Sequence, residues 1–383
     1  MKLRLILLSL FLSSALFSQK LDTLRFFSEV FDKEREVYIR LPEDHKYKSD
    51  LVKFPVIYVL DGQHEWFANP VVNDIDFMKY VYEMPSSIVV VIPHDKRNKE
   101  CSIGNLDDIT PLQTFIQEEV EKEISKYGLS DFRLIIGHSL SASFAMYAML
   151  EGGGFYSAVF AHTPMDHLNE LSERLASKES VKREHIFIST GGTDPDKDKH
   201  HRRAFEKAVM KYPEFYSEIN TYRVENATHN AVPIVATPVF LNKLFYTFSR
   251  RYSDIAFVDS LYQLAEVPKE VATEMKLIEE ASKVCDTYYP MEIAEMNGIA
   301  SRYGNSGFNQ HTLAVFEEGT KYYPKYYENQ LVLYSFYAET DKERAFGHLQ
   351  ESLRLVHLLE SEAPDYQELV NDIEEEIKNF ENK

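Results

Sequence analysis

The stretch from residue 131 to residue 150, D-F-R-L-I-I-G-H-S-L-S-A-S-F-A-M-Y-A-M-L, changes its pattern at Ser139. The apolar run at residues 132–136 predicts a buried strand, and the residues after the serine, rich in Ala, Met and Leu, predict a helix. A strand, a short turn and a helix with a serine at the apex are typical of a nucleophile elbow. Such a turn needs small residues two positions before and after the serine, where this chain has Gly137 and Ser141. Taken alone G-x-S-x-S is unspecific, and a serine-capped strand–helix turn is the alternative.

Further apolar runs predict a sheet around that strand. Residues 36–41 alternate like a half-buried strand, and residues 55–60 and 87–92 are continuously apolar, as central parallel strands are. Residues 110–127 have helical spacing, with a proline in the first turn and Gly128 after the end. Later strands are expected at residues 158–161, 185–189 and 218–224. Strands and helices in alternation, with an elbow among them, predict an α/β-hydrolase fold, a mostly parallel sheet covered on both faces.

The start and the length of the chain predict its organisation. Lys2 and Arg4 precede an apolar core at residues 5–17 that is too short to cross a bilayer, which is typical of a secretory signal peptide. We therefore expect an exported protein, periplasmic or secreted, with no membrane span. A length of 383 residues exceeds what one core usually organises. We expect a signal peptide at 1–19, an α/β-hydrolase domain at 20–249 and a helical domain at 250–383.

Composition limits the classes of partner and cofactor. With 44% hydrophobic residues, 24 Tyr and 25 Phe, the chain has the apolar content of a folded protein. A formal net charge of −19 argues against nucleic acid or an anionic membrane as partner. Cys101 and Cys285 fall in different segments, so no disulfide framework is expected. Because no H-E-x-x-H or C-x-x-C spacing occurs, we expect neither a metal nor another cofactor.

A nucleophilic serine needs a base and an acid that orients the base. In this fold the acid and then the histidine follow the serine along the chain. After the strand at 185–189, Asp194 is the first acid and is favoured over Asp196 and Asp198; a turn aspartate that caps a helix is the alternative. The loop after the next strand contains His229, the expected base, for which a surface-loop histidine is the alternative.

The oxyanion and the substrate need further groups. We expect two backbone N–H donors, one from Leu140 directly after the nucleophile and one from Gln63, in a loop where Gly62 lets the backbone turn toward the site. A plain strand-to-loop turn would look identical in sequence. The residues expected to contact substrate are Gly62, Trp66, Arg97, His138 and His162. For Arg97, which could meet an anionic substrate, a solvated loop is the favoured alternative. The run H-H-R-R at residues 200–203 is interpreted as a solvated helix start.

Three motifs together resemble a known family. They are V-I-Y-V-L-D-G-Q at 56–63, I-I-G-H-S-L-S-A at 135–142 and T-H-N-A-V-P at 228–233. In combination they resemble the putative-esterase (esterase D-like) branch of the α/β-hydrolases, over roughly residues 25–249. That branch includes siderophore, feruloyl and acetyl-xylan esterases, S-formylglutathione hydrolase and mycolyl transferases. Members usually have G-H-S-x-G-G, and here Ser141 and Ala142 replace the two glycines.

The resemblance implies cleavage of a carboxylic ester, small-molecule or glycan-linked, through an acyl-enzyme that water hydrolyses. It implies Ser139 as nucleophile, His229 as base, an acid near Asp194, and Gln63 with Leu140 as the oxyanion hole. An acyltransferase of the same fold is one alternative, and a non-catalytic binding or scaffold protein is another. The acyl group, the alcohol and the oligomeric state stay open at this stage.

The segment after residue 249 has helical spacing throughout. Helices are expected at 261–283, 290–303, 310–322, 328–339, 341–359 and 365–380. Residues 316–320 and 349–353 lie 33 positions apart, close to the tetratricopeptide (TPR) period of about 34 residues. The segment resembles a degenerate TPR array. We expect it to pack against the first domain, with binding of a protein partner or self-association as the alternative.

Overall fold

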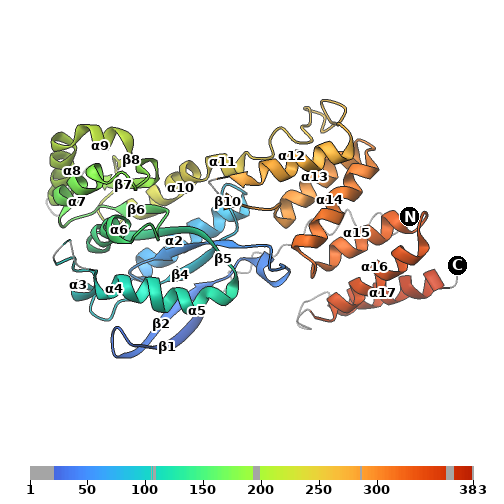
Figure 1. Ribbon diagram of the computed structural model, residues 1–383, viewed down its shortest axis with the longest axis horizontal. Coiled ribbons are helices and arrows are strands. Elements are labelled where there is room, and N and C mark those ends of the chain that lie inside the picture. The colour runs from blue at the N-terminus through green and yellow to red at the C-terminus, as the bar shows by residue number, and fades with distance from the viewer. Residues whose placement is uncertain are drawn as a thin grey trace.

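The computed structural model describes residues 21–104, 106, 109–192, 199–284, 287–358 and 366–381. An α/β part built on one large sheet occupies one end of the molecule, and a run of helices occupies the other (Figure 1). The expected signal peptide lies outside the described residues, as do Asp194, Asp196, Asp198 and Cys285. In the part of the chain that the structure describes, no helix combines the length and the apolarity needed to cross a membrane.

Eight strands form the sheet, in the order β1-β2-β4-β3-β5-β6-β7-β8. Their bounds are β1 Asp22–Ser28, β2 Lys33–Arg40, β3 Phe54–Val59, β4 Ile88–Val91, β5 Leu129–His138, β6 Ala158–His162, β7 Ile186–Gly191 and β8 Asn220–Val224. All neighbours from β4 to β8 pair in parallel, while β1 and β2 add an antiparallel edge. The parallel strands are apolar along their length because both faces are covered. The α/β-hydrolase fold predicted from the sequence is confirmed; β1 is an addition to it.

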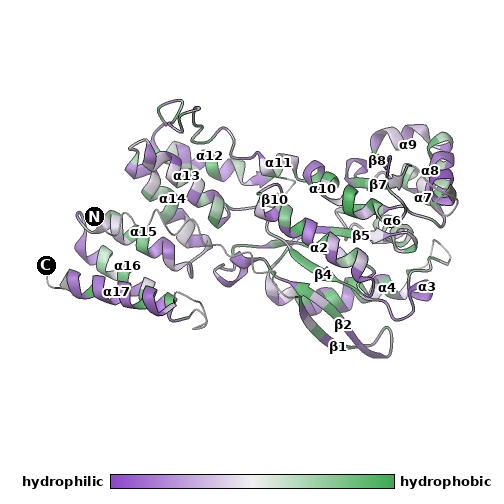
Figure 2. Cartoon of the chain, turned by 180° about the vertical axis from the view of Figure 1, so that it is seen from behind, coloured by the Kyte–Doolittle hydropathy of each residue, from purple (hydrophilic) through white to green (hydrophobic). Residues whose placement is uncertain are grey.

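Helices cover both faces of the sheet. Their bounds are α2 Glu65–Tyr80, α3 Arg97–Glu100, α4 Pro111–Thr114, α5 Glu121–Ile124, α6 Leu140–Glu151, α7 Leu168–Ser177, α8 Lys199–Lys211, α9 Pro213–Glu218, α10 Val232–Leu244 and α11 Tyr246–Ser249. Neighbouring residues of β3 face opposite ways, so Tyr58 packs in the core with α6 and Val59 in the core with α2 and α10. The central parallel strands, such as β4 and β7, are among the most hydrophobic segments in Figure 2, whereas the edge strands β1 and β2 mix hydrophilic and hydrophobic residues.

The helix expected at residues 110–127 forms with an irregularity. It starts as α4, continues through a π-helical turn at Phe115–Val120, and ends through α5 and a 3-10 turn at Ser125–Tyr127. Thr110 caps the start by accepting from the N–H of Gln113 (3.3 Å), and Gly128 ends it with a φ of 80°.

The C-terminal region is largely helical, as predicted, with two corrections: a late start of its first helix and a short antiparallel strand pair, β9 with β10, that was not predicted. Its elements are α12 Val271–Ala281, β9 Lys283–Val284, β10 Thr287–Tyr288, α13 Ile293–Asn305, α14 Asn309–Tyr322, α15 Tyr327–Tyr337, α16 Lys342–Val356 and α17 Tyr366–Glu381. The first helix was expected from residue 261 and begins at Val271, because turns and a bridge between Val258 and Leu264 occupy the preceding residues. From α13 to α17 each helix packs against the next. That succession is compatible with TPR-like repeats, which remain a prediction.

The helical region packs directly onto the α/β part. The N–H of Ser49 donates to the carbonyl of Tyr322 (2.7 Å), and the N–H of Ser86 donates to the Glu292 carboxylate (2.6 Å). The rings of Tyr47 and Tyr326 meet edge to face. One hydrophobic core runs through both parts, from the sheet to α17. Because this core is continuous, packing does not mark a boundary between the two parts, and the domain boundary at residue 249 remains a prediction.

Candidate active site

Ser139 stands between β5 and α6, at the C-terminal edge of the sheet. Its φ of 61° and ψ of −116° lie in a region that non-glycine residues rarely adopt. The N–H of Ser139 donates to the carbonyl of His162, the last residue of β6 (2.8 Å). At Gly137 a Cβ would lie 2.3 Å from the carbonyl oxygen of Ser141, so only glycine fits there. A strained serine beside a required glycine is the geometry of a nucleophile elbow.

The hydroxyl of Ser139 lies against a thioether. It donates to Sδ of Met165 (2.9 Å), in the loop after β6, and Met165 is 41% exposed whereas Ser139 is buried. The backbone N–H groups of Met165 and Asp166 both donate to Oγ of Ser143 on α6 (3.0 Å each). Met165 therefore covers the hydroxyl from the solvent side. Only the position of Met165 just after a parallel strand could have pointed to this contact in advance.

The two expected oxyanion donors follow neighbouring parallel strands, β3 and β5. The N–H of Gly62 donates to the carbonyl of Ile92 (2.9 Å), and the side-chain oxygen of Gln63 accepts from the N–H of His94 (2.8 Å). These two bonds attach the loop after β3 to the end of β4. Leu140 is the first residue of α6, where a backbone N–H has no acceptor within the helix. Both positions thus lie at the sheet edge that carries Ser139.

Asp61, the residue before Gly62, links that loop to the elbow. Arg97 donates from Nε to one carboxylate oxygen of Asp61 (2.6 Å) and from Nη2 to the other (2.9 Å). Ser141 donates its hydroxyl to Asp61 as well (2.5 Å), and Nη2 of Arg97 reaches the carbonyl of His138 (2.8 Å). Burial would raise the pKa of Asp61, but the bonds from Arg97 and Ser141 outweigh it, and the pKa is lowered. Arg97, expected to contact substrate, is thus engaged within the protein.

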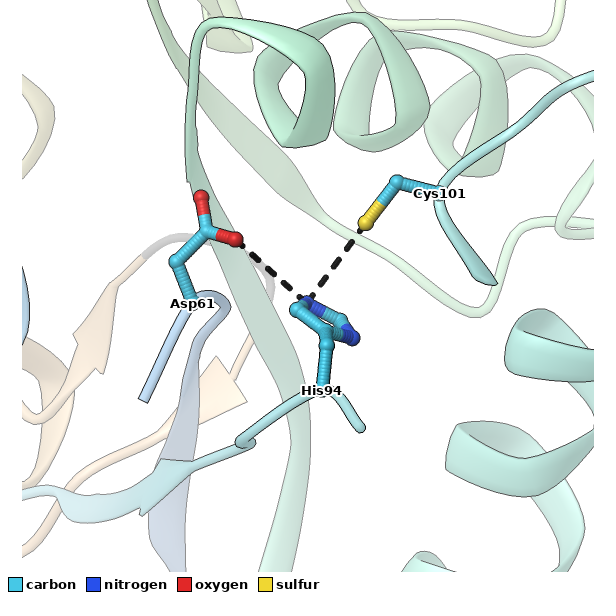
Figure 3. Close-up of side chains that lie close together, drawn as sticks. All are labelled: Asp61, His94 and Cys101. Atoms are coloured by element: carbon cyan, nitrogen blue, oxygen red, sulfur yellow. Dashed lines mark hydrogen bonds and ion pairs between the residues drawn. The ribbon is translucent and has the colours of Figure 1, made fainter. Parts of the chain in front are cut away.

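Asp61 also belongs to a buried group with His94 and Cys101 (Figure 3). Nε2 of His94 lies between the other two, 3.7 Å from Oδ1 of Asp61 and 3.5 Å from Sγ of Cys101, while Nδ1 faces the Glu100 carboxylate (3.2 Å). Among the described residues, these three have ligand types and spacing that could hold a metal ion. Arg97 already neutralises Asp61, however, and burial raises the pKa of the Cys101 thiol, which favours its protonated form. We interpret the group as a structural hydrogen-bonding network.

His138, directly before Ser139, lies among aromatic rings. Its ring centroid is 4.4 Å from that of His229, 5.4 Å from that of Trp66 and 5.6 Å from that of Phe67. Nε2 of His138 lies 3.1 Å from the carbonyl oxygen of His229, so this nitrogen carries the proton and donates. Burial lowers the pKa of His138 to about 4, which leaves the ring neutral at pH 7. The structure therefore attaches the loop of the expected base to the residue before the expected nucleophile.

His229 itself lies in the turn after β8 and is half-buried. Its ring stacks on that of His201, from the first turns of α8, with centroids 3.9 Å apart and an interplanar angle of 20°. The sequence interpretation missed His201, because the H-H-R-R run resembles a solvated helix start and only the fold brings it to His229. Asp194, the expected acid, lies in the segment just before α8, outside the described residues.

Two other expected substrate contacts have different surroundings. Trp66 is 43% exposed and stands beside the site. His162 is fully buried: Nδ1 lies 2.8 Å from Oγ of Ser189, Nε2 lies 3.2 Å from Oγ1 of Thr237, and its ring stacks on Phe240. Burial lowers the pKa of His162 to about 3, so it is a neutral core side chain at pH 7. In this structure His162 contributes its carbonyl to the elbow, and its side chain packs in the core.

Solved structures with the same fold are found despite low sequence identity. An IroE-like serine hydrolase from Shewanella oneidensis superimposes with a TM-score of 0.59 at 15% identity, covering 78% of this chain and 98% of its own. An uncharacterised protein from Capnocytophaga ochracea superimposes with a TM-score of 0.54 at 16% identity, covering 95% of this chain and 100% of its own. The second similarity extends over the sheet and the helical region alike. No curated protein matches the chain significantly in sequence.

Sequence comparison with protein families gives a direct assignment. The family described as "Putative esterase" matches residues 28–229, more than half of the chain. The matched segment includes the elbow serine, the loop after β3 and His229. With the α/β-hydrolase sheet and the strained serine described above, the match establishes that the chain belongs to the putative-esterase family and is a serine hydrolase of carboxylic esters.

Proposed function

We propose that the protein is an exported esterase that forms an acyl-enzyme on Ser139 and releases the acyl group to water. The observation that carries this proposal is the backbone of Ser139, whose φ of 61° holds the residue at the sharp turn between β5 and α6. A serine in that strained position presents its hydroxyl at the end of the sheet, where a substrate carbonyl can approach. Strain of this kind is a feature that folds retain at functional sites.

The other roles follow from position around the serine. His229 takes the proton of the Ser139 hydroxyl as the carbonyl is attacked, and returns it to the leaving alcohol. Asp194, or Asp196 in its place, orients the His229 imidazole. The N–H groups of Gln63 and Leu140 bind the oxyanion of the tetrahedral intermediate. Water then attacks the acyl-enzyme by the same route, with His229 again acting as base.

The surroundings of Ser139 favour an ester with an apolar or aromatic part. Met165 and the exposed Trp66 flank the elbow, and both are side chains that bind apolar groups by dispersion. Small-molecule and glycan-linked esters both remain within the proposal. An acyltransferase, in which a sugar hydroxyl replaces water, uses the same residues, and added alcohols would partition the products between hydrolysis and transfer.

A second candidate role concerns the helical region. Helices α13 to α17 pack successively, the arrangement by which repeat proteins build binding surfaces. Binding of a protein partner, or self-association, by this region is compatible with esterase activity elsewhere in the chain. In the non-catalytic version of this proposal the α/β part only binds its ligand, and turnover is absent.

The test is turnover of p-nitrophenyl acetate and butyrate by the protein lacking residues 1–19. We expect turnover by the wild type, its loss in Ser139→Ala and its full retention in Ser125→Ala. Ser125 is an exposed residue at the start of the 3-10 turn that follows α5. Fluorophosphonate labelling should follow the same pattern. Wild-type protein with neither turnover nor labelling would reject the esterase proposal in favour of the binding role.

A further inference from the structure

We infer that Ser141, Asp61 and Arg97 form a clamp that fixes the loop of Gln63 relative to the nucleophile elbow. Ser141 is then a positioning residue for the oxyanion donors, although it touches neither the substrate nor the reacting atoms. This inference rests on the proposed function, because it assigns the backbone of Gln63 and that of Leu140 to the oxyanion. It also explains the most conspicuous departure from the family pattern, a serine where a glycine is usual.

The Ser141 hydroxyl connects two backbone segments that are far apart in the chain. It donates to Oδ2 of Asp61 (2.5 Å) and accepts from the N–H of His138 (2.9 Å). The side chain is fully buried, so water does not compete for either bond. A glycine at this position would keep the tight turn but lose both bonds.

Arg97 forms the second connection between the same two segments. Its Nη2 bonds both Oδ2 of Asp61 and the carbonyl of His138 (2.9 and 2.8 Å), and its Nε bonds Oδ1 (2.6 Å). Both backbone polar groups of His138 and both carboxylate oxygens of Asp61 are therefore held, by one serine and one arginine. The result is a closed ring of hydrogen bonds, and the paired charges of Asp61 and Arg97 make it stronger than neutral bonds would.

The clamp completes the attachment of the oxyanion loop. On one side Gly62 and Gln63 are bonded to the end of β4, as described above. On the other side Asp61, itself at a φ of 61°, is bonded to the elbow. Donors to a developing oxyanion stabilise it only when they are held at the correct distance, and a misplacement of about 1 Å can cost roughly 100-fold in rate. A loop attached on both sides has the rigidity that this requires.

The experiment compares Ser141→Ala and Ser141→Gly with the wild type on p-nitrophenyl acetate. We expect kcat to fall by roughly 10- to 100-fold while KM stays within about twofold, because ground-state binding does not use the oxyanion donors. The affinity for a trifluoromethyl ketone, which forms a tetrahedral oxyanion on the serine, should fall by the same factor as kcat/KM. Ser141→Gly is the variant that keeps the turn unstrained, so it tests the inference if Ser141→Ala folds poorly.

The matched control is Ser172→Ala. Ser172 is an equally buried serine on α7 whose hydroxyl bonds the carbonyl of Leu168 and the hydroxyl of Tyr216. The Ser172→Ala variant should have a lower thermal stability than the wild type and an unchanged kcat. Combining Ser141→Ala with Arg97→Lys should cost less than the product of the two single effects, because both remove parts of one ring.

The outcomes separate the clamp from the esterase proposal. The clamp inference is overturned if the wild type is active and both Ser141 variants keep its kcat, or lose activity only in proportion to the loss of folded protein. The esterase proposal is unaffected by that result. Equal losses of kcat and of affinity for the trifluoromethyl ketone, at unchanged KM, support the clamp. Absence of wild-type turnover and of Ser139 labelling rejects the proposed function itself, and the clamp with it.

Discussion

Two loops flank Ser139, and they are held in opposite ways. The loop after β3 is anchored by Asp61, which is 1% exposed and bonded to Arg97 and Ser141. The loop after β6 places Met165, 41% exposed, over the hydroxyl, and the N–H groups of Met165 and Asp166 share one neutral acceptor, the hydroxyl oxygen of Ser143. This difference in anchoring matches the different roles proposed for the two loops. In the proposed mechanism, the side that would hold the oxyanion donors is fixed by buried charge, and the side that would meet the substrate has an exposed thioether.

The largest effect should come from removing the charge that fixes the first loop. Arg97→Ala leaves the Asp61 carboxylate buried without its cation, and we expect a loss of about 3 kcal/mol in the free energy of unfolding. Arg25→Ala is the matched control, since the Arg25–Glu36 pair lies on the surface and should contribute less than about 1 kcal/mol. Urea unfolding at pH 7 measures both. Equal losses in the two variants would contradict a special role for the buried pair.

A smaller effect concerns His138, whose ring carries the link to the His229 loop. Its pKa is lowered to about 4 in the folded state, against about 6.5 when unfolded. Between these two pH values His138 is therefore protonated in the unfolded chain but neutral in the folded protein. Stability is therefore complete above about pH 6.5 and falls as the pH drops toward 4. Between pH 7 and 5 the expected loss from this group is about 2 kcal/mol.

His138→Gln keeps a donor for the His229 carbonyl but cannot titrate. Urea unfolding of the wild type and the variant at pH 7 and 5 isolates the contribution, because every other histidine of the chain is present in both proteins. We expect the variant to lose about 2 kcal/mol less than the wild type over this interval. The same pH dependence in both proteins would show that His138 does not carry it.

The smallest effect concerns the second loop. Met165→Ala removes an apolar side chain from the nucleophile, and we expect kcat/KM for p-nitrophenyl benzoate to rise by about 3- to 10-fold relative to that for the acetate. Met210→Ala, on α8 and 76% exposed, is the control and should leave the ratio unchanged. An unchanged ratio in Met165→Ala would mean that the loop after β6 does not set the size of the acyl group.

The fold was predictable where local pattern decides the structure. The apolar runs of β3, β4 and β5, the small residues around Ser139 and the spacing of the C-terminal helices all act within a few residues of the chain. The edge strand β1 was not predicted, because half-exposed edge strands have mixed sequences. The segment before Val271 was mistaken for helix because its apolar residues have helical spacing, although most of them are exposed and lie in turns.

The site was less predictable, because its contacts join distant segments. Neither His201 beside His229 nor Met165 over Ser139 leaves a local pattern, and the burial of His162 depends on α10 covering it. Asp61 and Arg97 lie 36 positions apart, so their pairing appears only once β3 and β4 are aligned.

The central claim is that Ser139 carries the acyl group. Brief incubation with p-nitrophenyl acetate, acid quenching and peptide mass mapping would detect the intermediate directly. We predict an acetyl adduct on the peptide that contains Ser139 and no adduct in Ser139→Ala. In His229→Ala both formation and hydrolysis of the adduct should slow, because His229 acts as the base in both steps. Turnover that persists in Ser139→Ala, or an adduct on another residue at full activity, would contradict the account.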